Sequence, residues 1–239
     1  EWFDGKAVAA PQLYRALERL NKEYGTMSLA ELSQPAIDLA RQGFTCNFLY
    51  EYAMYHPLCG HAASHSEYYK KVYMNGGEKY KFGDKIVNPD LADTMEQVAQ
   101  KGVDWFYNSE VADRMVECVQ KRDGVLTKED LVTCTAKERP VVRGTFMGYD
   151  IVSMSPPSSG GSHIIQMLNI LENFDIKSMG HNSADYLHLL CETIKLMFAD
   201  RSVAMGDPDY VKVDVARIIS KEYAKECAAR INLERAQEY

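Results

Sequence analysis

Hydrophobic residues in the first part of the chain recur every three or four positions, which is the spacing of amphipathic helices. From Gln12 to Glu23 this pattern follows a proline, and proline suits the first turn of a helix. The glycine after it, Gly25, is expected to take the left-handed conformation of a helix cap. The pattern repeats from Leu29 to Gln42, where Pro35 predicts two short helices or one kinked helix, closed by Gly43.

Two further helices are predicted between residues 88 and 121. The pair Asn88-Pro89 combines a capping residue with a proline at the first helical position, and Gly102 ends the helix. The residues expected on its buried side are Leu91, Met95, Val98 and Ala99. The second helix is expected from Ser109 to Lys121.

The remaining stretches of the first half carry shorter signals. Thr127 and Asp130 resemble a capping box, which predicts a short helix from Lys128 to Val132. The segment from Tyr80 to Asp84 is expected to be extended. The aromatic and polar stretch from Phe48 to Tyr73 has weak periodicity and predicts no defined element.

The pattern changes at Arg139, where alternating hydrophobic residues replace the helical spacing. Two strands are expected between Val141 and Val152, joined at Met147-Gly148 in a hairpin. After Pro156-Pro157 the predicted helices are Gly161 to Leu171, Ser183 to Asp200 and Ser220 to Ile231. We therefore expect an α+β chain dominated by helices and forming one segment, mainly helical over 1–138, with a short hairpin and then helices over 139–239.

The charge and hydropathy of the chain exclude two classes of partner. Its 239 residues carry 34 acidic against 27 basic side chains, a net charge of −7, and contain no basic stretch that would displace counterions from phosphates. No apolar run approaches the roughly 20 residues that a membrane-spanning helix needs. We therefore expect neither a nucleic-acid partner nor a membrane span in this segment.

The six cysteines are scattered and include no CxxC pair. We expect buried or half-buried free thiols, which are typical of a reducing compartment. Because the chain begins with Glu1 rather than methionine, we expect it to be a piece of a longer protein.

The segment Ser158-Ser159-Gly160-Gly161 is the candidate binding site of the sequence. It opens a predicted helix, so its free amides and the helix dipole can face an anion, and it can border a carboxylate-binding pocket. The alternative is a helix cap and a tight turn, which serine and glycine also form without any ligand.

A metal site is not expected. His56, Cys59, His61 and His65 lie within ten residues and are suitable zinc ligands, but their spacing fits no established zinc pattern. The acidic residues Asp200, Asp207 and Asp209 lack the order of an EF-hand loop. We expect a turn at Asp207-Pro208-Asp209 and a local ion pair between Asp200 and Arg201.

Three titratable side chains, His188, Glu192 and Lys195, share one face of a predicted helix. Such a group can perform general acid–base catalysis. The pattern is more typical of a solvated charged face, and that interpretation is the one favoured here.

Ordered sequence blocks resemble one enzyme family. They read AVAAP at Ala7 to Pro11, YGTM at Tyr24 to Met27, QPAIDLARQGF at Gln34 to Phe44, FGDKIVNPDLA at Phe82 to Ala92, LTKEDL at Leu126 to Leu131, SPPSSGG at Ser155 to Gly161, MLNILENFDI at Met167 to Ile176, ADRS at Ala199 to Ser202, and GDPDYVKV at Gly206 to Val213. Together they cover essentially the whole chain and resemble the large subunit of the γ-glutamyltransferases (glutathione hydrolases). The family differs in having Pro-Gly at Pro11-Gln12 and a third proline at Ser155.

This resemblance implies an N-terminal-nucleophile hydrolase with an αββα fold. In such a family the precursor cuts itself, and the new N-terminal threonine of the small subunit attacks the γ-glutamyl amide and passes the acyl group to water or an amine. The threonine and the arginine that holds the glutamyl carboxylate lie outside this chain. The resemblance therefore assigns no catalytic residue and no cofactor here, and it implies that the chain alone is inactive.

The resemblance also implies partners. These are the nucleophile-bearing small subunit from the same precursor and a small-molecule γ-glutamyl substrate, and apolar surface left uncovered would favour self-association. Three alternatives stay open: a non-catalytic structural or interaction relative, a related acylase, and a poly-γ-glutamate depolymerase. The family is usually exported whereas the cysteines favour a reducing compartment, so the location stays undecided.

Overall fold

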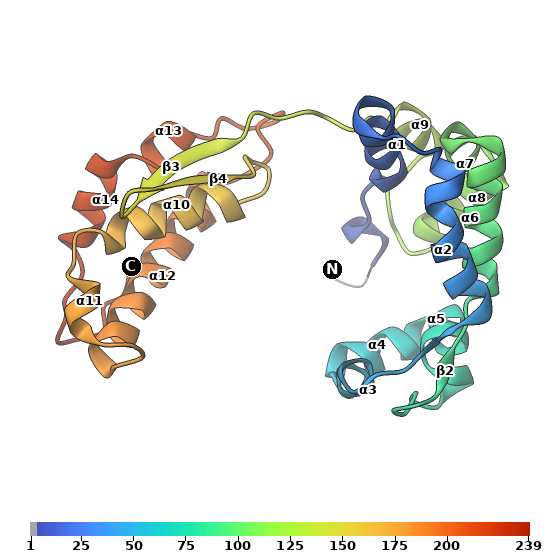
Figure 1. The fold of residues 1–239 in the computed structure, drawn as a ribbon, viewed down its shortest axis with the longest axis horizontal. Coiled ribbons are helices and arrows are strands. Elements are labelled where there is room, and N and C mark those ends of the chain that lie inside the picture. Colours follow the sequence, from blue (N-terminus) through green and yellow to red (C-terminus); the bar gives the residue numbers. More distant parts are fainter. Residues whose placement is uncertain (1–3) are drawn as a thin grey trace. The chain divides into compact units, whose positions relative to one another are not determined.

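The computed structural model describes residues 4–239, and these residues divide into two compact units. Unit 1 ends at Lys137, and unit 2 covers Glu138–Tyr239. Unit 1 is almost entirely helical, whereas unit 2 combines one β-hairpin with helices (Figure 1).

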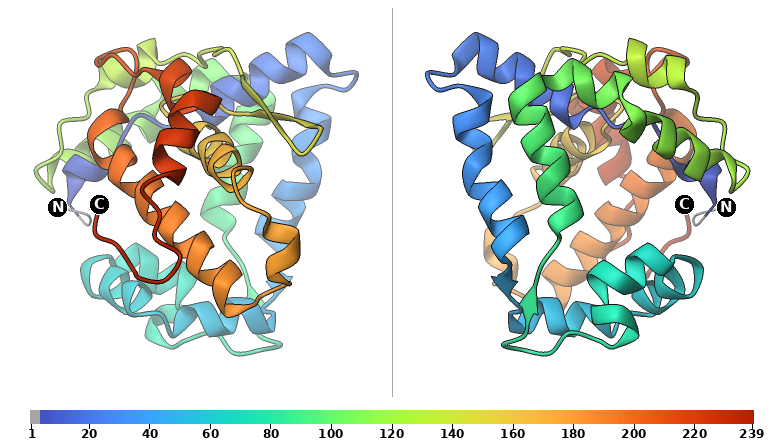
Figure 2. Two further views of the ribbon diagram at one scale, coloured as in Figure 1. Left: turned by 90° about the vertical axis from the view of Figure 1, so that its left-hand side faces the viewer. Right: turned by 90° about the vertical axis from the view of Figure 1, so that its right-hand side faces the viewer.

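Unit 1 is built around two long helices that run side by side, α2 and α6 (Figure 2). Its elements are, in chain order, η1 (Gly5–Ala7), α1 (Leu13–Tyr24), α2 (Leu29–Gln42), β1 (Phe44–Thr45), α3 (Phe48–Met54), α4 (Pro57–His65), α5 (Glu67–Tyr73), η2 (Asn75–Gly77), β2 (Lys85–Ile86), α6 (Pro89–Lys101), α7 (Val103–Asn108), α8 (Glu110–Gln120) and α9 (Lys128–Thr133). The short strands β1 and β2 pair antiparallel. The main core of the unit contains Val98, Val103, Tyr107, Ala112, Val119, Leu126, Leu131 and Cys134.

Side-chain caps begin most helices of unit 1, and two of them were predicted. Asn88 accepts a hydrogen bond from the backbone of Leu91 at the start of α6. Thr127 and Asp130 form the expected reciprocal capping box before α9. Each cap satisfies backbone N–H groups that have no partner in the first turn of a helix.

Three details of the first helices can be compared with the sequence expectations. Gly25 has a φ of −76°, so it is not left-handed, and a Cβ there would lie 2.5 Å from the backbone oxygen of Asn21. Of the two alternatives at Pro35, the structure has the single helix, α2, and not two short ones, and Ser28 closes a capping box at its start. Leu91 is 43% exposed, and Ala92 takes the buried position instead.

The stretch from Phe48 to Tyr73, which predicted no element, folds as α3, α4 and α5. Each of these helices is only two turns long, too short for a periodic pattern to stand out. The expected extended segment from Tyr80 to Asp84 contains a turn, and the strand lies just beyond it. Helix α8 begins one residue after Ser109, which caps it, and the preceding α7 was not predicted.

Unit 2 begins with the predicted hairpin and continues with helices. Its elements are β3 (Val142–Phe146), β4 (Tyr149–Ser153), α10 (Gly160–Leu171), α11 (Ile176–Met179), α12 (Ala184–Ala204), α13 (Val215–Ile218) and α14 (Lys221–Ala228). The strands pair antiparallel with Phe146 opposite Tyr149. The loop residues Met147 and Gly148 both have positive φ, at 48° and 85°, which matches the twist of a two-residue hairpin turn.

Helix α10 packs against the hairpin at two glycines. A Cβ on Gly144 in β3 would lie 2.5 Å from Ile165, and a Cβ on Gly161 would lie 2.1 Å from the carbonyl oxygen of Met154. Both distances are shorter than carbon atoms tolerate, so side chains at these positions would push the helix away. The close contact buries the first turns of α10 beneath the hairpin (Figure 1).

The turn of the hairpin is tied to the far end of the same helix. Glu172, which follows α10, accepts a hydrogen bond of 2.6 Å from the backbone N–H of Met147. It also forms an ion pair with Lys221. Lys221 also donates to the carbonyl of Thr145 at 2.8 Å. The hydrogen bond from Lys221, together with that from Met147, lowers the pKa of Glu172 below its ordinary value.

The last residues of the chain lie along α12 and are held by a buried carboxylate. Glu192 is 1% exposed and accepts hydrogen bonds from Tyr239 Oη at 2.7 Å and Gln237 N at 3.2 Å. Lys195 pairs with the same carboxylate, and His188 contacts the carbonyl of Asn232. The expectation of a solvated charged face was therefore wrong for Glu192, which is buried, and all three side chains contact the segment after α14 or the carboxylate that holds it.

All six cysteines are free thiols. The buried cysteines are Cys46, Cys134 and Cys227, whereas Cys118 and Cys191 are exposed, contrary to the expectation of burial. Burial raises the pKa of the Cys46 and Cys227 thiols.

Replacing Gly161 with alanine tests the close contact between α10 and β4. We expect Gly161→Ala to destabilise unit 2 by about 3 kcal/mol, because the new methyl group overlaps a backbone carbonyl that cannot rotate away. Gly160→Ala is the matched control, since its Cβ meets only Ser158 Oγ at 3.6 Å. Urea unfolding followed by circular dichroism measures both changes, and equal stability of the two variants would contradict the packing argument.

Replacing Glu192 with glutamine tests the buried carboxylate. We expect Glu192→Gln to lower the free energy of unfolding by about 3 kcal/mol, because Lys195 loses its charged partner and one acceptor becomes a donor. Glu226→Gln on the exposed side of α14 is the control and should change stability by less than about 0.5 kcal/mol.

The same carboxylate predicts how stability depends on pH. Burial alone would raise the pKa of Glu192, but hydrogen bonds from Lys195, Tyr239 and Gln237 outweigh it and lower the pKa below the ordinary 4.5. The native state therefore binds this proton less readily than the unfolded chain, and its contribution to stability is complete above about pH 4.5 and disappears as the pH falls through the lowered pKa. We expect the free energy of unfolding, measured from pH 7 to pH 3, to fall less steeply in Glu192→Gln than in the unchanged chain.

Candidate functional site

The candidate segment Ser158–Gly161 lies at the start of α10, where the helix leaves the hairpin (Figure 1). Both serines are half-buried, Gly160 is exposed and Gly161 is buried. Ser159 occupies the capping position, but its side chain makes no capping hydrogen bond. Ser158 Oγ accepts only a long hydrogen bond of 3.4 Å from Gly160 N. The segment thus forms a turn and a helix start without a side-chain cap, and its first amides retain the capacity to bind an anion.

A positive charge lies beside this segment. Arg201 in α12 donates a hydrogen bond from Nε to Ser159 Oγ at 3.1 Å, and its guanidinium lies 5.9 Å from the ring of Phe198. Arg201 makes no ion pair within the described residues 4–239. The expected local pair between Asp200 and Arg201 is therefore wrong, because consecutive residues of a helix point in different directions.

Asp200 instead points into unit 2 and accepts hydrogen bonds from two other helices. Tyr223 Oη donates to both carboxylate oxygens at 2.8 and 2.9 Å, and Gln166 Nε2 donates to one of them. Burial, reinforced by the hydrogen bond to Asp200, raises the pKa of Tyr223 above its ordinary value. The guanidinium of Arg217 lies over this ring, 3.9 Å from its centre.

The orientation of Gln166 sets the proton position on a neighbouring histidine. Because its amide nitrogen donates to Asp200, its oxygen is left to accept, and it lies 2.7 Å from His163 Nδ1. His163 therefore carries a proton on Nδ1. Its Nε2 atom and Ser162 Oγ are both buried and have no partner among the described residues. The buried side of α10 is thus polar over its first two turns.

This arrangement is suited to binding an anion and not to nucleophilic attack. The group hydrogen-bonded to Ser159 Oγ is the guanidinium of Arg201, which is a donor and cannot accept the hydroxyl proton. In the described part of the chain, no histidine or carboxylate is hydrogen-bonded to Ser158 or Ser159. A serine nucleophile requires such a base within hydrogen-bond reach.

The other sequence candidates are dispersed. His56 caps α4 through Nδ1, Cys59 donates to the carbonyl of Ala53, and His65 contacts Ser64, while the side chain of His61 lies outside the described part of the structure. Within the described residues no group of three or more acidic, histidine or cysteine side chains has the geometry to hold a metal. Asp207 and Asp209 lie in a turn, as expected, and both pair with Arg139.

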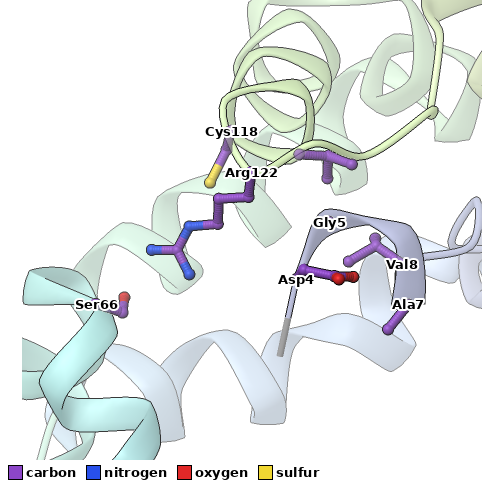
Figure 3. Close-up of a pocket in the computed structure, with 8 residues that line it drawn as sticks. Asp4, Gly5, Ala7, Val8, Ser66, Cys118 and Arg122 are labelled. Atoms are coloured by element: carbon purple, nitrogen blue, oxygen red, sulfur yellow. The ribbon is translucent and has the colours of Figure 1, made fainter. Parts of the chain in front are cut away.

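A separate hollow of about 360 Å³ lies in unit 1, between η1, the end of α8 and the start of α5. Its wall is formed by Asp4, Gly5, Ala7, Val8, Ser66, Cys118, Val119 and Arg122. Arg122 reaches across it towards Ser66 and donates to the carbonyl of His65, with Cys118 beside it (Figure 3). The hollow is open, and the guanidinium of Arg122 already donates to the backbone carbonyl of His65. The hollow is therefore less suited to binding an anion than the start of α10.

Two residues of the site region were not predicted from the sequence. Gln166 and Tyr223 lie on α10 and α14, far apart in the chain, and only tertiary packing brings them to Asp200. The one local signal was the polar Gln166 between the apolar residues Ile165 and Met167.

Among the helices formed by residues 4–239, none is both long and apolar enough to cross a lipid bilayer.

Comparisons with known proteins point to one family. The model of the gamma-glutamyltranspeptidase family matches residues 2–239. The glutathione hydrolase proenzyme of Escherichia coli strain K12 is 42% identical over 218 residues, which cover 90% of this chain and 37% of the proenzyme. The acylase ACY 1 proenzyme of Pseudomonas sp. strain SE83 is 38% identical over 234 residues, covering 98% of this chain and 42% of that protein. The chain thus spans about two fifths of the length of these relatives.

A solved structure agrees with the sequence matches. The crystal structure of Helicobacter pylori gamma-glutamyltranspeptidase superposes with a TM-score of 0.89 at 36% identity, covering 99% of this chain and 68% of that chain. With a family match over nearly every residue and this structural likeness, the chain belongs to the gamma-glutamyltranspeptidase family and has the helix-dominated α+β structure of that N-terminal-nucleophile hydrolase family.

Proposed function

We propose that this chain is the large-subunit part of a γ-glutamyltransferase or glutathione hydrolase. The observation that carries the proposal is the match to a glutathione hydrolase proenzyme over 90% of this chain but only 37% of the proenzyme. The catalytic threonine would then belong to the small subunit of the same precursor.

The geometry of the serines supports a nucleophile outside the chain. Ser159 accepts from Arg201, and Ser158 accepts from a backbone amide, so among the described residues neither hydroxyl has a base to activate it. The chain by itself is therefore proposed to be inactive. Its contribution to the reaction is to support the small subunit and to border the substrate.

The start of α10 is the proposed substrate-contacting part of this chain. The amides at Gly160 and Gly161 and the guanidinium of Arg201 together favour a carboxylate, and a γ-glutamyl substrate carries carboxylates. Ser158 and Ser159 provide hydroxyls at the same place.

Exposed apolar side chains support the proposed association with a small subunit. Helix α1 has a strongly amphipathic sequence, yet none of its residues is buried. Leu13, Leu20 and Tyr24, at 68%, 57% and 77% exposure, lie along one face of the helix. Uncovered faces of this kind mark protein contacts, and without a partner they also favour self-association.

A second candidate is an acylase that cleaves a related amide. It is favoured by the acylase ACY 1 proenzyme, which is 38% identical over 98% of this chain. The same precursor processing would serve both enzymes, so they differ in the acyl group accepted.

Self-processing of the full-length gene product tests the proposed function. We expect purified protein to separate into two fragments on incubation, the smaller one beginning with threonine, as measured by intact mass and N-terminal sequencing. The 239-residue chain expressed alone should hydrolyse γ-glutamyl-p-nitroanilide no faster than buffer does. A full-length chain that stays intact for days and never turns over would contradict the proposal.

A substrate panel on the processed protein separates the two candidates. Faster hydrolysis of glutathione than of an N-acyl amide without the glutamyl α-carboxylate would support the hydrolase, and the reverse order would support the acylase.

A further inference from the structure

The turn after α5 contains an asparagine followed by two glycines. Asn75 is the one asparagine of the sequence that directly precedes a glycine. Residues 75–77 form η2, and all of them are exposed. Asparagine is among the chemically labile residues, and a glycine after it leaves the next backbone nitrogen free to approach the asparagine side chain.

The folded chain leaves both groups of this pair available for reaction. Among the described residues, the backbone N–H of Gly76 donates no hydrogen bond, and the side chain of Asn75 has no partner. A Cβ placed on Gly76 would meet no atom within 4 Å, so the peptide group between the two residues has room to rotate. Both residues have positive φ, at 44° and 73°, which regular helices and strands do not use.

Two comparable pairs in the chain are protected by a hydrogen bond. Asp123 also has a positive φ and precedes a glycine, but the Gly124 amide donates to a backbone carbonyl at 3.0 Å. Asn182 is exposed and has a φ of 53°, but the amide of Ser183 after it donates to a carbonyl at 3.4 Å. An amide that is engaged in this way must lose its hydrogen bond before its nitrogen can attack a side chain.

We propose that Asn75-Gly76 is a site of spontaneous deamidation with water as the only co-reactant. The backbone nitrogen of Gly76 attacks the side-chain carbonyl carbon of Asn75, and the new carbon–nitrogen bond closes a succinimide ring. The bond from this carbon to the side-chain nitrogen breaks, and ammonia leaves with the proton of the Gly76 amide. Water then opens the ring at either carbonyl and gives aspartate or isoaspartate. This inference is independent of the proposed function.

Both products weaken the end of α5. Isoaspartate lengthens the backbone inside the turn that the Gly77 amide closes by donating to the carbonyl of Met74 at 2.7 Å. Aspartate adds a negative charge at the C-terminal end of the helix, where the helix dipole disfavours it. Because Met74 is 6% exposed and packs against Met54, a change in this turn acts on a buried contact.

Incubation of the full-length gene product at pH 8, followed by peptide mapping with mass spectrometry, tests the site. We expect conversion at Asn75 to be about tenfold faster than at Asn182, because no hydrogen bond holds the attacking nitrogen. Aspartate and isoaspartate should appear as two chromatographically separate peptides of equal mass. Conversion at Asn75 no faster than at Asn182 would overturn the proposal.

Two controls separate the folded turn from the sequence pair. Asn75→Gln keeps a side-chain amide but places it one carbon further from the backbone, so conversion in this peptide should cease. Incubation in urea removes the hydrogen bond of the Ser183 amide, so conversion at Asn182 should rise much more than at Asn75. If urea accelerates both asparagines equally, the folded turn does not leave the pair open and the structural argument fails.

Amide hydrogen exchange tests the effect of the products on the turn. In the isoaspartate fraction of the incubated protein, we expect the Gly77 amide to exchange about tenfold faster than in fresh protein. Asn75→Asp is the matched control, because it adds the charge without lengthening the backbone, and it should raise this rate less. Unchanged exchange in the isoaspartate fraction would overturn the proposed effect on α5.

Discussion

The contact between α10 and the β3–β4 hairpin is the constraint on which the rest of unit 2 depends. It exists only because Gly144 and Gly161 lack side chains where the helix and the strands come within van der Waals distance. With the helix in this place, Glu172 at its end reaches the hairpin turn, and Gln166 on its buried side reaches Asp200. The candidate site is therefore a consequence of packing at two positions that carry no functional group.

Hydrogen bonds between buried polar groups fix the orientation of the packed helices. An apolar contact between helices tolerates small rotations, whereas hydrogen bonds to a carboxylate are satisfied in few orientations. Asp200 and Glu192 lie on the same helix, α12, and each gathers donors from segments distant in the chain. Helix α12 therefore holds α10 and α14 at one end and the C-terminal residues near its middle.

The parts of the fold that were predicted correctly are those governed by neighbours in sequence. Asn88, Thr127 and the Met147-Gly148 turn act within a few residues, so their patterns are sufficient to place a helix start or a hairpin. The roles of Glu192 and Asp200 depend on residues tens of positions away, and a charged side chain on a helix is most often solvated. The serine–glycine segment was located from its motif, but its contact with Arg201 could be identified only in the folded chain.

The three buried thiols report on the two units separately. Cys46 and Cys134 lie in unit 1 and Cys227 lies in unit 2, and none is accessible while its unit is folded. The raised pKa of Cys46 and Cys227 slows their alkylation further, because only the thiolate reacts. A thiol-reactive mass tag applied to native protein would therefore label Cys118 and Cys191 at once and record the opening of each unit as the later gain of mass on its own peptides.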